Sequence, residues 1–336
     1  MQDTRYTMDE LITALRSSPR LAEKVNLRNL WDIIPGVCEV DGRNVILGDD
    51  AAAIETQDGY LLAAAEGVYP ELLKSNPYLA GRTSVLTNVS DIYAMGGRPV
   101  AILDVLFSPN LEEVNDIVRG IKDNAYRYHV PLVGGHLNRK TDFSSLSVFI
   151  IGRATRLLSS FNAQAGDDLV FVCSLDGQFH SGFNFWDSSS ELSSEDALRQ
   201  LEVFPRLAEE GKVDTAKDVS MAGLIGSVLM LLECSGKGAE IQIERIPKPY
   251  AIPLRDWLIT FPSYGFILSI RPQHTTEVKR IFDSINLTCE VIGKVIRGGN
   301  VLFVKNGVEK RLFWDTEAEP VIGIGKDRLK KVKNGE

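Results

Sequence analysis

The sequence predicts a two-domain protein that combines α/β and α+β architecture. Its 336 residues exceed the usual size of one domain and suggest two. In the first half, strand-like apolar runs alternate with helix-like runs, which indicates an α/β or α+β domain. A new strand at 169–173 follows a polar stretch around Gly166. We therefore expect domains over residues 1–157 and 158–325, followed by a disordered, Lys-rich tail over 326–336.

The composition narrows the classes of function. Hydrophobic residues make up 44% of the chain, as in a globular protein with a large core, and the net charge is −8. This acidic balance, with no basic tract longer than Lys330-Lys331, argues against binding to nucleic acid or to an anionic membrane. No segment approaches the roughly 20 apolar residues of a membrane helix, and the N-terminus lacks a secretion-signal pattern.

The cysteines and histidines follow no pattern of a disulfide framework or a zinc site. The four cysteines form no Cys-x-x-Cys motif, and the four histidines lack paired spacing. A reduced, cytoplasmic protein is the simplest interpretation. The cysteines are Cys38, Cys173, Cys234 and Cys289.

The first half begins with a helical region, residues 8–34, which Pro19 divides into two helices. The expected elements after it are a strand at 45–47 ending in the acidic loop 48–50, a strand at 60–65 ending at Glu66, a helix at 83–95 closed by Gly96-Gly97, and a strand at 100–107. A capping-box-like start at Asn110 opens the next helix. We then expect a strand at 130–133, a turn at Gly134-Gly135-His136, and a strand at 146–151.

The second half is expected to be a mixture of strands and helices. Strands are predicted at 169–173, 239–243 and 266–270, a terminal hairpin at 291–295 and 301–304, and helices from Ser193 to Gly211, from 221 to 234 and from 278 to 285.

Adjacent carboxylates follow the first strand, in Gly48-Asp49-Asp50-Ala51-Ala52. Mg²⁺ prefers hard oxygen ligands and is usually held by one or two carboxylates together with phosphates. The small flanking residues would let phosphate oxygens approach the backbone. An acidic surface turn is the simpler explanation for this motif alone.

Asp91 lies in the middle of a predicted helix whose neighbouring positions are small or apolar. Thr87, Asn88 and Asp91 are three or four residues apart and share one face of that helix. Aspartate is a mediocre helix former, and an unpaired buried carboxylate is costly unless a cation or hydrogen-bond donors compensate it. The simpler alternative is that Asp91 is a solvent-exposed residue on the helix surface.

Three further groups are weak signals individually. Glycines before His136 leave room for a ligand, although a plain turn with an exposed histidine fits equally well. Glu66 ends a strand that points toward the same region. Asp218 and Ser220 precede a helix, where such residues are most often caps.

The nucleotide motifs of commoner folds are absent. Ser235-Gly-Lys237-Gly lacks the glycine spacing of a P-loop, and Gly323-Ile-Gly325 lacks the third glycine of a dinucleotide fingerprint. Any ATP site in this chain must therefore work chiefly through carboxylates and metal.

Taken together and in this order, the motifs resemble the aminoimidazole-ribonucleotide-synthetase-related superfamily. Asp91-Ile-Tyr-Ala-Met-Gly-Gly-Arg-Pro99 is similar to a segment of selenophosphate synthetases, as are Gly134-Gly135-His136 and Asp218-Val-Ser-Met-Ala-Gly-Leu-Ile-Gly226. Asn88, three residues before Asp91, fits the thiamine-monophosphate kinase pattern. The resemblance covers roughly residues 40–300.

The resemblance implies an N-terminal α/β domain that pairs with a partner subunit, a C-terminal α+β domain, and ATP bound with Mg²⁺ in a cleft. Carried over by position, the implied metal ligands are Asp49, Asp50, Asp91 and Asp218, and the implied nucleotide contacts are Glu66, Asn88, Asp91, Gly134, Gly135 and His136. A homodimer that acts on a small molecule is the expected assembly.

The chain also departs from selenophosphate synthetases. Residues 1–37 contain no cysteine, Gly36 is the only glycine there, and Glu66 stands where the superfamily usually has aspartate. Selenophosphate synthesis is therefore not expected. The leading hypothesis is an ATP-dependent phosphoryl-transfer enzyme. The alternatives are a nucleotide-binding regulatory protein without turnover and a purely structural dimeric partner.

Overall fold

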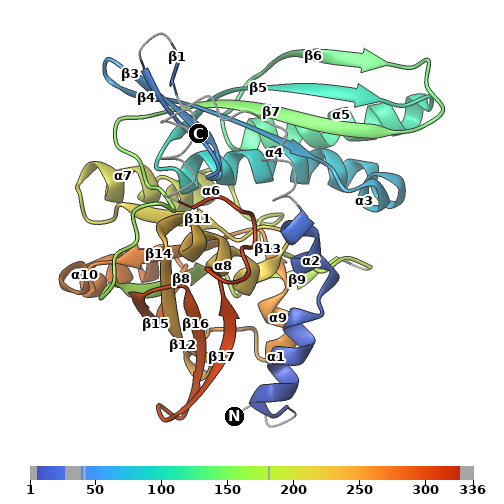
Figure 1. Ribbon diagram of the computed structural model, residues 1–336. Coiled ribbons are helices and arrows are strands. Elements are labelled where there is room, and N and C mark those ends of the chain that lie inside the picture. The colour runs from blue at the N-terminus through green and yellow to red at the C-terminus, as the bar shows by residue number, and fades with distance from the viewer. Residues whose placement is uncertain (1–5, 27–38, 41–42, 181, 326–336) are drawn as a thin grey trace.

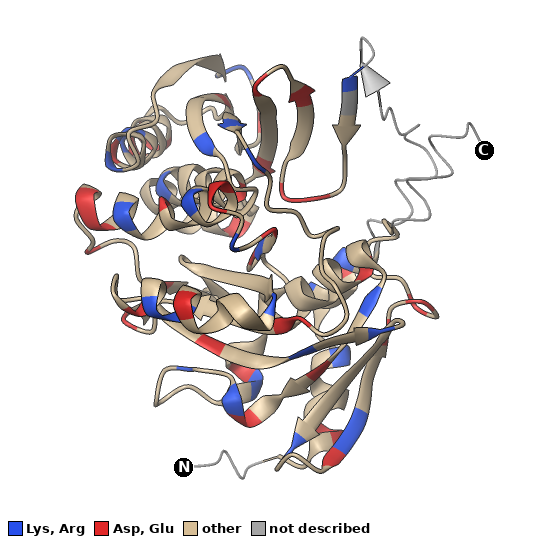
Figure 2. Cartoon of the chain, turned by 90° about the vertical axis from the view of Figure 1, so that its left-hand side faces the viewer, with Lys and Arg blue, Asp and Glu red and all other residues tan. Residues whose placement is uncertain are grey.

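The computed structural model describes residues 6–26, 39–40, 43–180 and 182–325. Two large sheets lie at opposite ends of the molecule, and helices fill the space between them (Figure 1). The view turned by 90° shows the same layers, with acidic and basic residues interspersed over both halves (Figure 2). The predicted two-domain combination of sheets and helices is confirmed.

The N-terminal sheet has seven strands in the order β1-β2-β3-β4-β7-β5-β6. Its strands are β1 (Glu39–Val40), β2 (Arg43–Ile46), β3 (Ala52–Thr56), β4 (Gly59–Gly67), β5 (Arg98–Phe107), β6 (Leu132–Asn138) and β7 (Ser145–Ala154). Neighbours are antiparallel except β5 and β6, which are parallel. A parallel pair needs a crossover, and helix α5 (Leu111–Arg127) supplies it.

Helix α4 (Pro77–Ala94) packs with α5 on one face of this sheet, and the short helix α3 (Pro70–Ser75) precedes it. The two long helices approach closely because Gly81 faces the backbone of Ile117 and Gly120 faces the backbone of Tyr78; a Cβ at either glycine would overlap the opposite backbone. Nearly all of α4 is therefore buried, including Asp91.

The C-terminal sheet also has seven strands, in the order β11-β14-β8-β15-β12-β16-β17. They are β8 (Asp168–Cys173), β11 (Thr215–Asp218), β12 (Lys237–Gln242), β14 (Gly265–Ile270), β15 (Thr288–Arg297), β16 (Asn300–Lys305) and β17 (Glu309–Asp315). A small sheet joins β9 (Gln178–Phe179), β10 (Phe185–Asp187) and β13 (Phe261–Pro262). The helices of this half are α6 (Ser194–Leu201), α7 (Val203–Glu209), α8 (Gly223–Ser235), α9 (Leu254–Leu258), α10 (Pro272–Asp283) and the 3-10 helix η2 (Ile243–Arg245).

The two N-terminal helices, α1 (Met8–Arg16) and α2 (Pro19–Asn26), pack with the second half of the chain. Met8, Leu11 and Leu15 join the core formed by α8 and the C-terminal sheet, and the Arg16 guanidinium lies 4.2 Å from the ring centre of Trp314. The division of this region at Pro19 is confirmed over the described residues. A domain boundary near residue 157 stays a prediction, but assigning residue 8 onward to the first domain did not anticipate this packing.

Several local features differ from what the sequence predicts. Gly134-Gly135-His136 lies inside edge strand β6 instead of forming a turn. The segments at 291–295 and 301–304 do not pair as a hairpin, because β12 lies between β15 and β16 and pairs with both. Strand β3 was not predicted, because its sequence is short and rich in alanine. It pairs with β4.

Some predictions fall on residues that the structure does not describe, namely the helical segment 27–34, Cys38 and the tail 326–336. Within the described part of the chain, none of the helices is long and apolar enough to cross a membrane.

Candidate functional site

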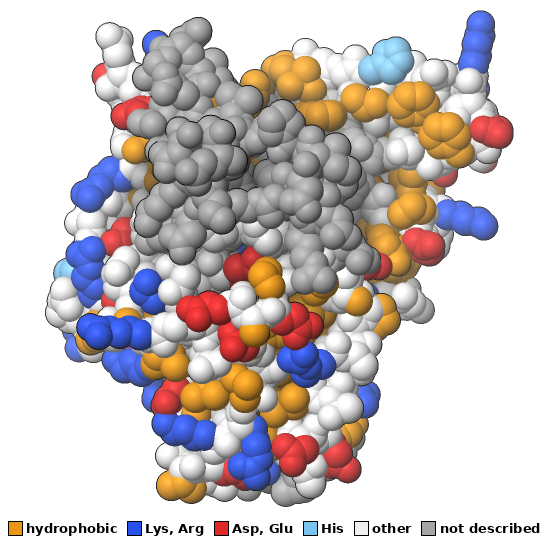
Figure 3. Space-filling model, viewed as in Figure 1, with side chains coloured by type: hydrophobic (Ala, Val, Ile, Leu, Met, Phe, Trp, Pro, Cys, Tyr) orange, Lys and Arg blue, Asp and Glu red, His pale blue; other side chains and the backbone are white. Residues whose placement is uncertain are grey.

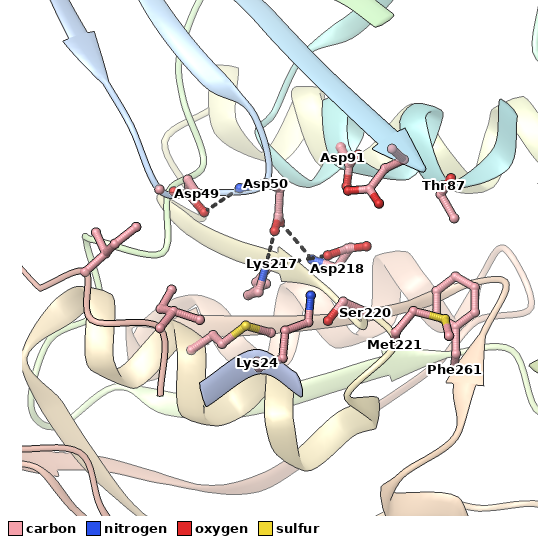
Figure 4. Close-up of a pocket in the computed structure, with 15 residues that line it drawn as sticks. Lys24, Asp49, Asp50, Thr87, Asp91, Lys217, Asp218, Ser220, Met221 and Phe261 are labelled. Atoms are coloured by element: carbon pink, nitrogen blue, oxygen red, sulfur yellow. Dashed lines mark hydrogen bonds and ion pairs between the residues drawn. The ribbon is translucent and has the colours of Figure 1, made fainter. Parts of the chain in front are cut away.

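A cleft of about 280 Å³ lies between the two halves and brings together most of the predicted acidic residues (Figure 4). The acidic loop supplies Asp49 and Asp50, β4 supplies Glu66, α4 supplies Asp91, and the end of β11 supplies Asp218. Other lining residues include Lys24, Gly48, Thr87, Lys217, Ser220, Met221, Phe261, Ile322 and Ile324. The cleft therefore concentrates carboxylates from segments far apart in the sequence.

The acidic loop is held in place by residues from the second half of the molecule. Gly48 has φ +86° and sits so close to Ile324 that a Cβ would lie 2.5 Å from its Cδ1. The Asp49 carboxylate accepts hydrogen bonds from Ser159 Oγ at 2.7 Å and from the Ser160 N–H at 2.8 Å. Burial and the neighbouring Asp50 raise the pKa of Asp49, while these donors oppose the shift. One Asp49 oxygen thus anchors the loop.

Asp50 is paired with a buried lysine that the sequence analysis did not single out. Its carboxylate forms an ion pair with Lys217 Nζ and accepts the Asp218 N–H at 3.0 Å. Burial alone would lower the pKa of Lys217, but Asp50, Asp218 and Asp49 outweigh burial and raise it. In the sequence, Lys217 stands out only as the residue next to Asp218. That every residue of its strand, β11, is buried becomes visible only in the structure.

Asp91 is the carboxylate with the least compensation. It is 5% exposed, and its Oδ2 is buried without a hydrogen-bond partner among the described residues. Burial, followed by Asp218, Glu66 and Asp50, raises the pKa of Asp91 well above its ordinary value. The solvated-surface explanation for Asp91 is therefore wrong, and nothing described identifies it as part of a hydrogen-bond network.

Asp218 lies across the cleft from Asp91, and burial and Asp50 raise its pKa to about 8. It does not cap the following helix. The N-cap of α8 is Ala222, without a side-chain cap, and the Ser220 N–H donates to Ser227 Oγ at 2.9 Å. The bland explanation of Asp218 and Ser220 as helix caps is therefore wrong.

Glu66 is exposed to water within the cleft, yet the surrounding protein is dense enough to raise its pKa. Lys24, from α2, also lines the cleft and was not anticipated because its segment carries no motif. Thr87 lines the cleft, whereas Asn88 is fully buried and donates to the Ser84 carbonyl at 2.8 Å. The Asn88 Oδ1 has no partner among the described residues.

Gly134, Gly135 and His136 do not reach this cleft within one chain. They lie exposed on β6, and the His136 ring centre is 6.3 Å from that of Phe107. Their role as nucleotide contacts stays a prediction.

The donor set suits Mg²⁺ in its chemistry, because all the acidic groups offer hard oxygen ligands. The buried, unpartnered Asp91 Oδ2 is the oxygen most available to bind such an ion. No three such groups in the described residues already converge around one metal position, and Lys217 engages Asp50. Phosphate oxygens or water would therefore have to complete the coordination of a bound ion.

Among the described residues, the free cysteines Cys173, Cys234 and Cys289 are all buried, and burial raises the pKa of each thiol. None of these thiols is suited to act as a nucleophile at the cleft.

Comparison with protein families adds independent evidence. Residues 48–154 match the model for the N-terminal domain of AIR synthase related proteins, and residues 164–305 match the model for the C-terminal domain. The chain belongs to the AIR synthase-related family. Members of this family are ATP-dependent enzymes.

Relatives of this family member include two uncharacterized proteins. The chain is 44% identical to protein sll0787 of Synechocystis sp. over 85% of this chain and 89% of that protein. It is 35% identical to protein MJ0640 of Methanocaldococcus jannaschii over 73% and 76% of the two chains. PurL of the same archaeon is 25% identical over 94% of this chain and 44% of its own length.

Solved structures of the AIR synthase-related fold agree with this assignment. PurL of T. maritima in complex with ADP has a TM-score of 0.68 at 20% identity, covering 91% of this chain and 52% of that one. ThiL in complex with AMPPCP and TMP has a TM-score of 0.60 at 23% identity, covering 80% and 91%. The chain thus spans about half the length of PurL but most of ThiL.

Proposed function

We propose that this protein is an ATP- and Mg²⁺-dependent enzyme that transfers a phosphoryl group to an oxygen of a small metabolite. The observation that carries the proposal is the group of five cleft carboxylates, with the Asp91 Oδ2 buried and unpartnered. A group of buried carboxylates of this kind lowers the stability of the folded protein unless cations neutralise its charge. The nucleotides in the PurL and ThiL complexes support the choice of ATP.

The carboxylates divide into two roles. Asp91, whose Oδ2 has no partner among the described residues, and Asp218, whose carboxylate lies 3.6 Å from Lys217 Nζ, would hold Mg²⁺. Asp50 would turn from Lys217 toward the ion. Asp49, bonded by Ser159 and Ser160, would keep the loop in register. When bound, Mg²⁺ supplies neutralisation of phosphate charge.

The transfer needs positioning more than covalent chemistry from the protein. The bond between the γ-phosphorus and the bridging oxygen of ATP breaks and leaves ADP. A new bond forms between that phosphorus and the acceptor oxygen, whose proton passes to solvent. Lys217 Nζ, which remains protonated beside Asp50, would contribute positive charge at the phosphates.

Calorimetric titration of ATP with excess Mg²⁺, and again with excess chelator, tests the proposal. We expect binding that depends on the metal. Equal affinity under both conditions would refute the metal bridge. Consumption of ATP with a panel of small metabolites then tests turnover.

A nucleotide-binding regulatory protein is the second candidate. The observation that favours it is the Lys217–Asp50 ion pair, which engages one of the metal-binding carboxylates. ATP binding without ATP consumption across the metabolite panel would support this alternative.

We also propose that the protein is a homodimer through its N-terminal sheet. This sheet exposes Val100, Leu132, Val133, Phe149 and Ile151. On β7, Phe149 and Ile151 alternate with the buried Val148 and Ile150, so they lie on the face away from the core and present apolar surface there. Figure 3 shows hydrophobic side chains gathered over this end of the molecule. In such a dimer, exposed β6 residues would be available to the partner's cleft.

A further inference from the structure

A second cavity, of about 360 Å³, adjoins the acidic cleft. The two cavities share Glu66, Thr87, Met221 and Phe261 as lining residues. In Figure 4, Thr87, Met221 and Phe261 lie at the end of the acidic cleft that is farthest from Asp49. A molecule in the second cavity would therefore reach the carboxylates from that end.

Four aromatic side chains contribute to the walls of this second cavity. Tyr69, Phe183, Phe185 and Phe261 all line it. The Phe185 and Phe261 rings stack with centroids 5.4 Å apart and an interplanar angle of 29°. Sites of this size with apolar walls and a few polar groups are typical of small-molecule binding, and stacked aromatic walls favour a planar ring.

Arg20 is the cation among the described lining residues of this cavity, which the carboxylates of Glu66 and Glu71 also line. Arg20, from α2, lines it, and its Nη1 is buried with no hydrogen-bond partner among the described residues. Burial lowers the pKa of Arg20, which reflects the cost of keeping the guanidinium out of water. A guanidinium matches carboxylate and phosphate groups through paired hydrogen bonds.

We propose that this second cavity binds the phosphoryl acceptor, a small metabolite with a planar ring and a carboxylate or phosphate group held by Arg20. The ring would lie between the aromatic walls, and the reacting oxygen would face the border at Glu66 and Thr87. The acceptor role rests on the proposed phosphoryl transfer. The ligand chemistry rests on the cavity alone.

Ligand-observed NMR titrations of the full chain test the ligand chemistry with three probes: phenyl phosphate, benzoate and the neutral benzyl alcohol. We expect one or both anions to bind with a Kd on the order of 1 mM, as for small fragments, and at least about tenfold more tightly than the alcohol. The anion that binds more tightly distinguishes a phosphate-bearing from a carboxylate-bearing acceptor.

Variants locate the binding. Arg20→Gln should weaken anion binding by about tenfold or more, Arg20→Lys should keep part of it, and Arg245→Gln, at an exposed position on η2, should leave it unchanged. Thermal melts establish that each variant is folded. Binding of benzyl alcohol as tight as that of the anions overturns the proposal even without variants, as does anion binding that Arg20→Gln leaves intact.

Mg-ATP titrations on the wild type and on Arg20→Gln test the proposed function separately from the acceptor cavity. We expect equal Mg-ATP affinity, because Arg20 lines only the second cavity. Mg-ATP binding without any dependence of anion binding on Arg20 refutes the acceptor cavity alone. Absence of Mg-ATP binding in the wild type refutes the proposed function and the acceptor role with it.

Discussion

Replacing Asp91 by asparagine should weaken binding of Mg-ATP strongly while leaving the apoprotein stable. The substitution keeps the shape of the side chain but removes an ionisable carboxyl whose Oδ2 has no partner among the described residues. Disrupting even the supporting groups of metal sites costs about 10–100-fold in affinity. A loss of this size, or larger, corresponds to about 1.4–2.7 kcal/mol.

The loss should grow with pH. Burial and the carboxylates of Asp218, Glu66 and Asp50 hold the pKa of Asp91 well above its ordinary value, so a proton competes with the metal for Asp91 up to a higher pH than at an ordinary aspartate. A metal ligand must be deprotonated, so wild-type binding tightens as pH rises toward this pKa, by up to about tenfold per pH unit. The asparagine variant cannot gain in this way, and the ratio of the two affinities should widen.

The stability of the apoprotein should change in the opposite direction to Mg-ATP affinity, in favour of the asparagine variant. A carboxyl whose folded-state pKa is raised contributes stability that is fully present below its unfolded-state pKa of about 4 and is lost as pH rises from there through the folded-state pKa. The asparagine variant lacks this loss. We therefore expect the asparagine apoprotein to be at least as stable as the wild type at neutral pH, with an advantage that grows as pH rises further toward the folded-state pKa.

Calorimetry from about pH 6 to about pH 8 and urea unfolding of the apoproteins measure both effects. Asp116→Asn is the matched control, because the half-exposed Asp116 on α5 forms an ion pair with nearby Arg119 on the same helix. An unchanged Mg-ATP affinity would refute the reasoning. A large loss of apo stability would instead identify Asp91 as a structural residue.

Three further predictions concern other parts of the molecule. Lys217→Met removes the cation paired with Asp50 and should destabilise the metal-free protein by about 3–5 kcal/mol, with excess MgCl₂ recovering part of the loss in thermal melts; an unaffected melting temperature would contradict the importance of this pair. Burial would raise the pKa of Asp187, but hydrogen bonds from neighbouring serines and from His180, at 2.9 Å, lower the pKa overall. Asp187 therefore contributes stability above about pH 4, and this stability is lost on acidification. Asp187→Asn should therefore be less stable near neutral pH and less sensitive to acid in urea unfolding, and identical acid sensitivity would count against this assignment. Phe149→Glu on the apolar sheet face should shift light scattering toward the monomer, whereas a wild type that is already monomeric at micromolar concentration would rule out the dimer.

Much of the local structure could be predicted because it depends on neighbours in the sequence. The periodicity of residues 111–127 and the Asn110 cap identified α5, and the structure shows Asn110 Oδ1 accepting the Glu112 N–H at 2.9 Å. Segments with less regular spacing of apolar residues were harder to predict. Helix α4 begins at Pro77 instead of Thr83, because burial on all sides removes the amphipathic signal at its start.

The sequence by itself determined the family and the acidic groups of the site, because paired carboxylates after a strand and Asp91 within an apolar helix are local patterns. Only the tertiary structure decided which groups meet these acids. Lys217 comes to Asp50 from 167 positions along the chain, and α2 brings Lys24 and Arg20 to the two cavities. Such contacts depend on how helices and sheets pack, and packing energy is shared among many distant apolar residues that carry no motif of their own.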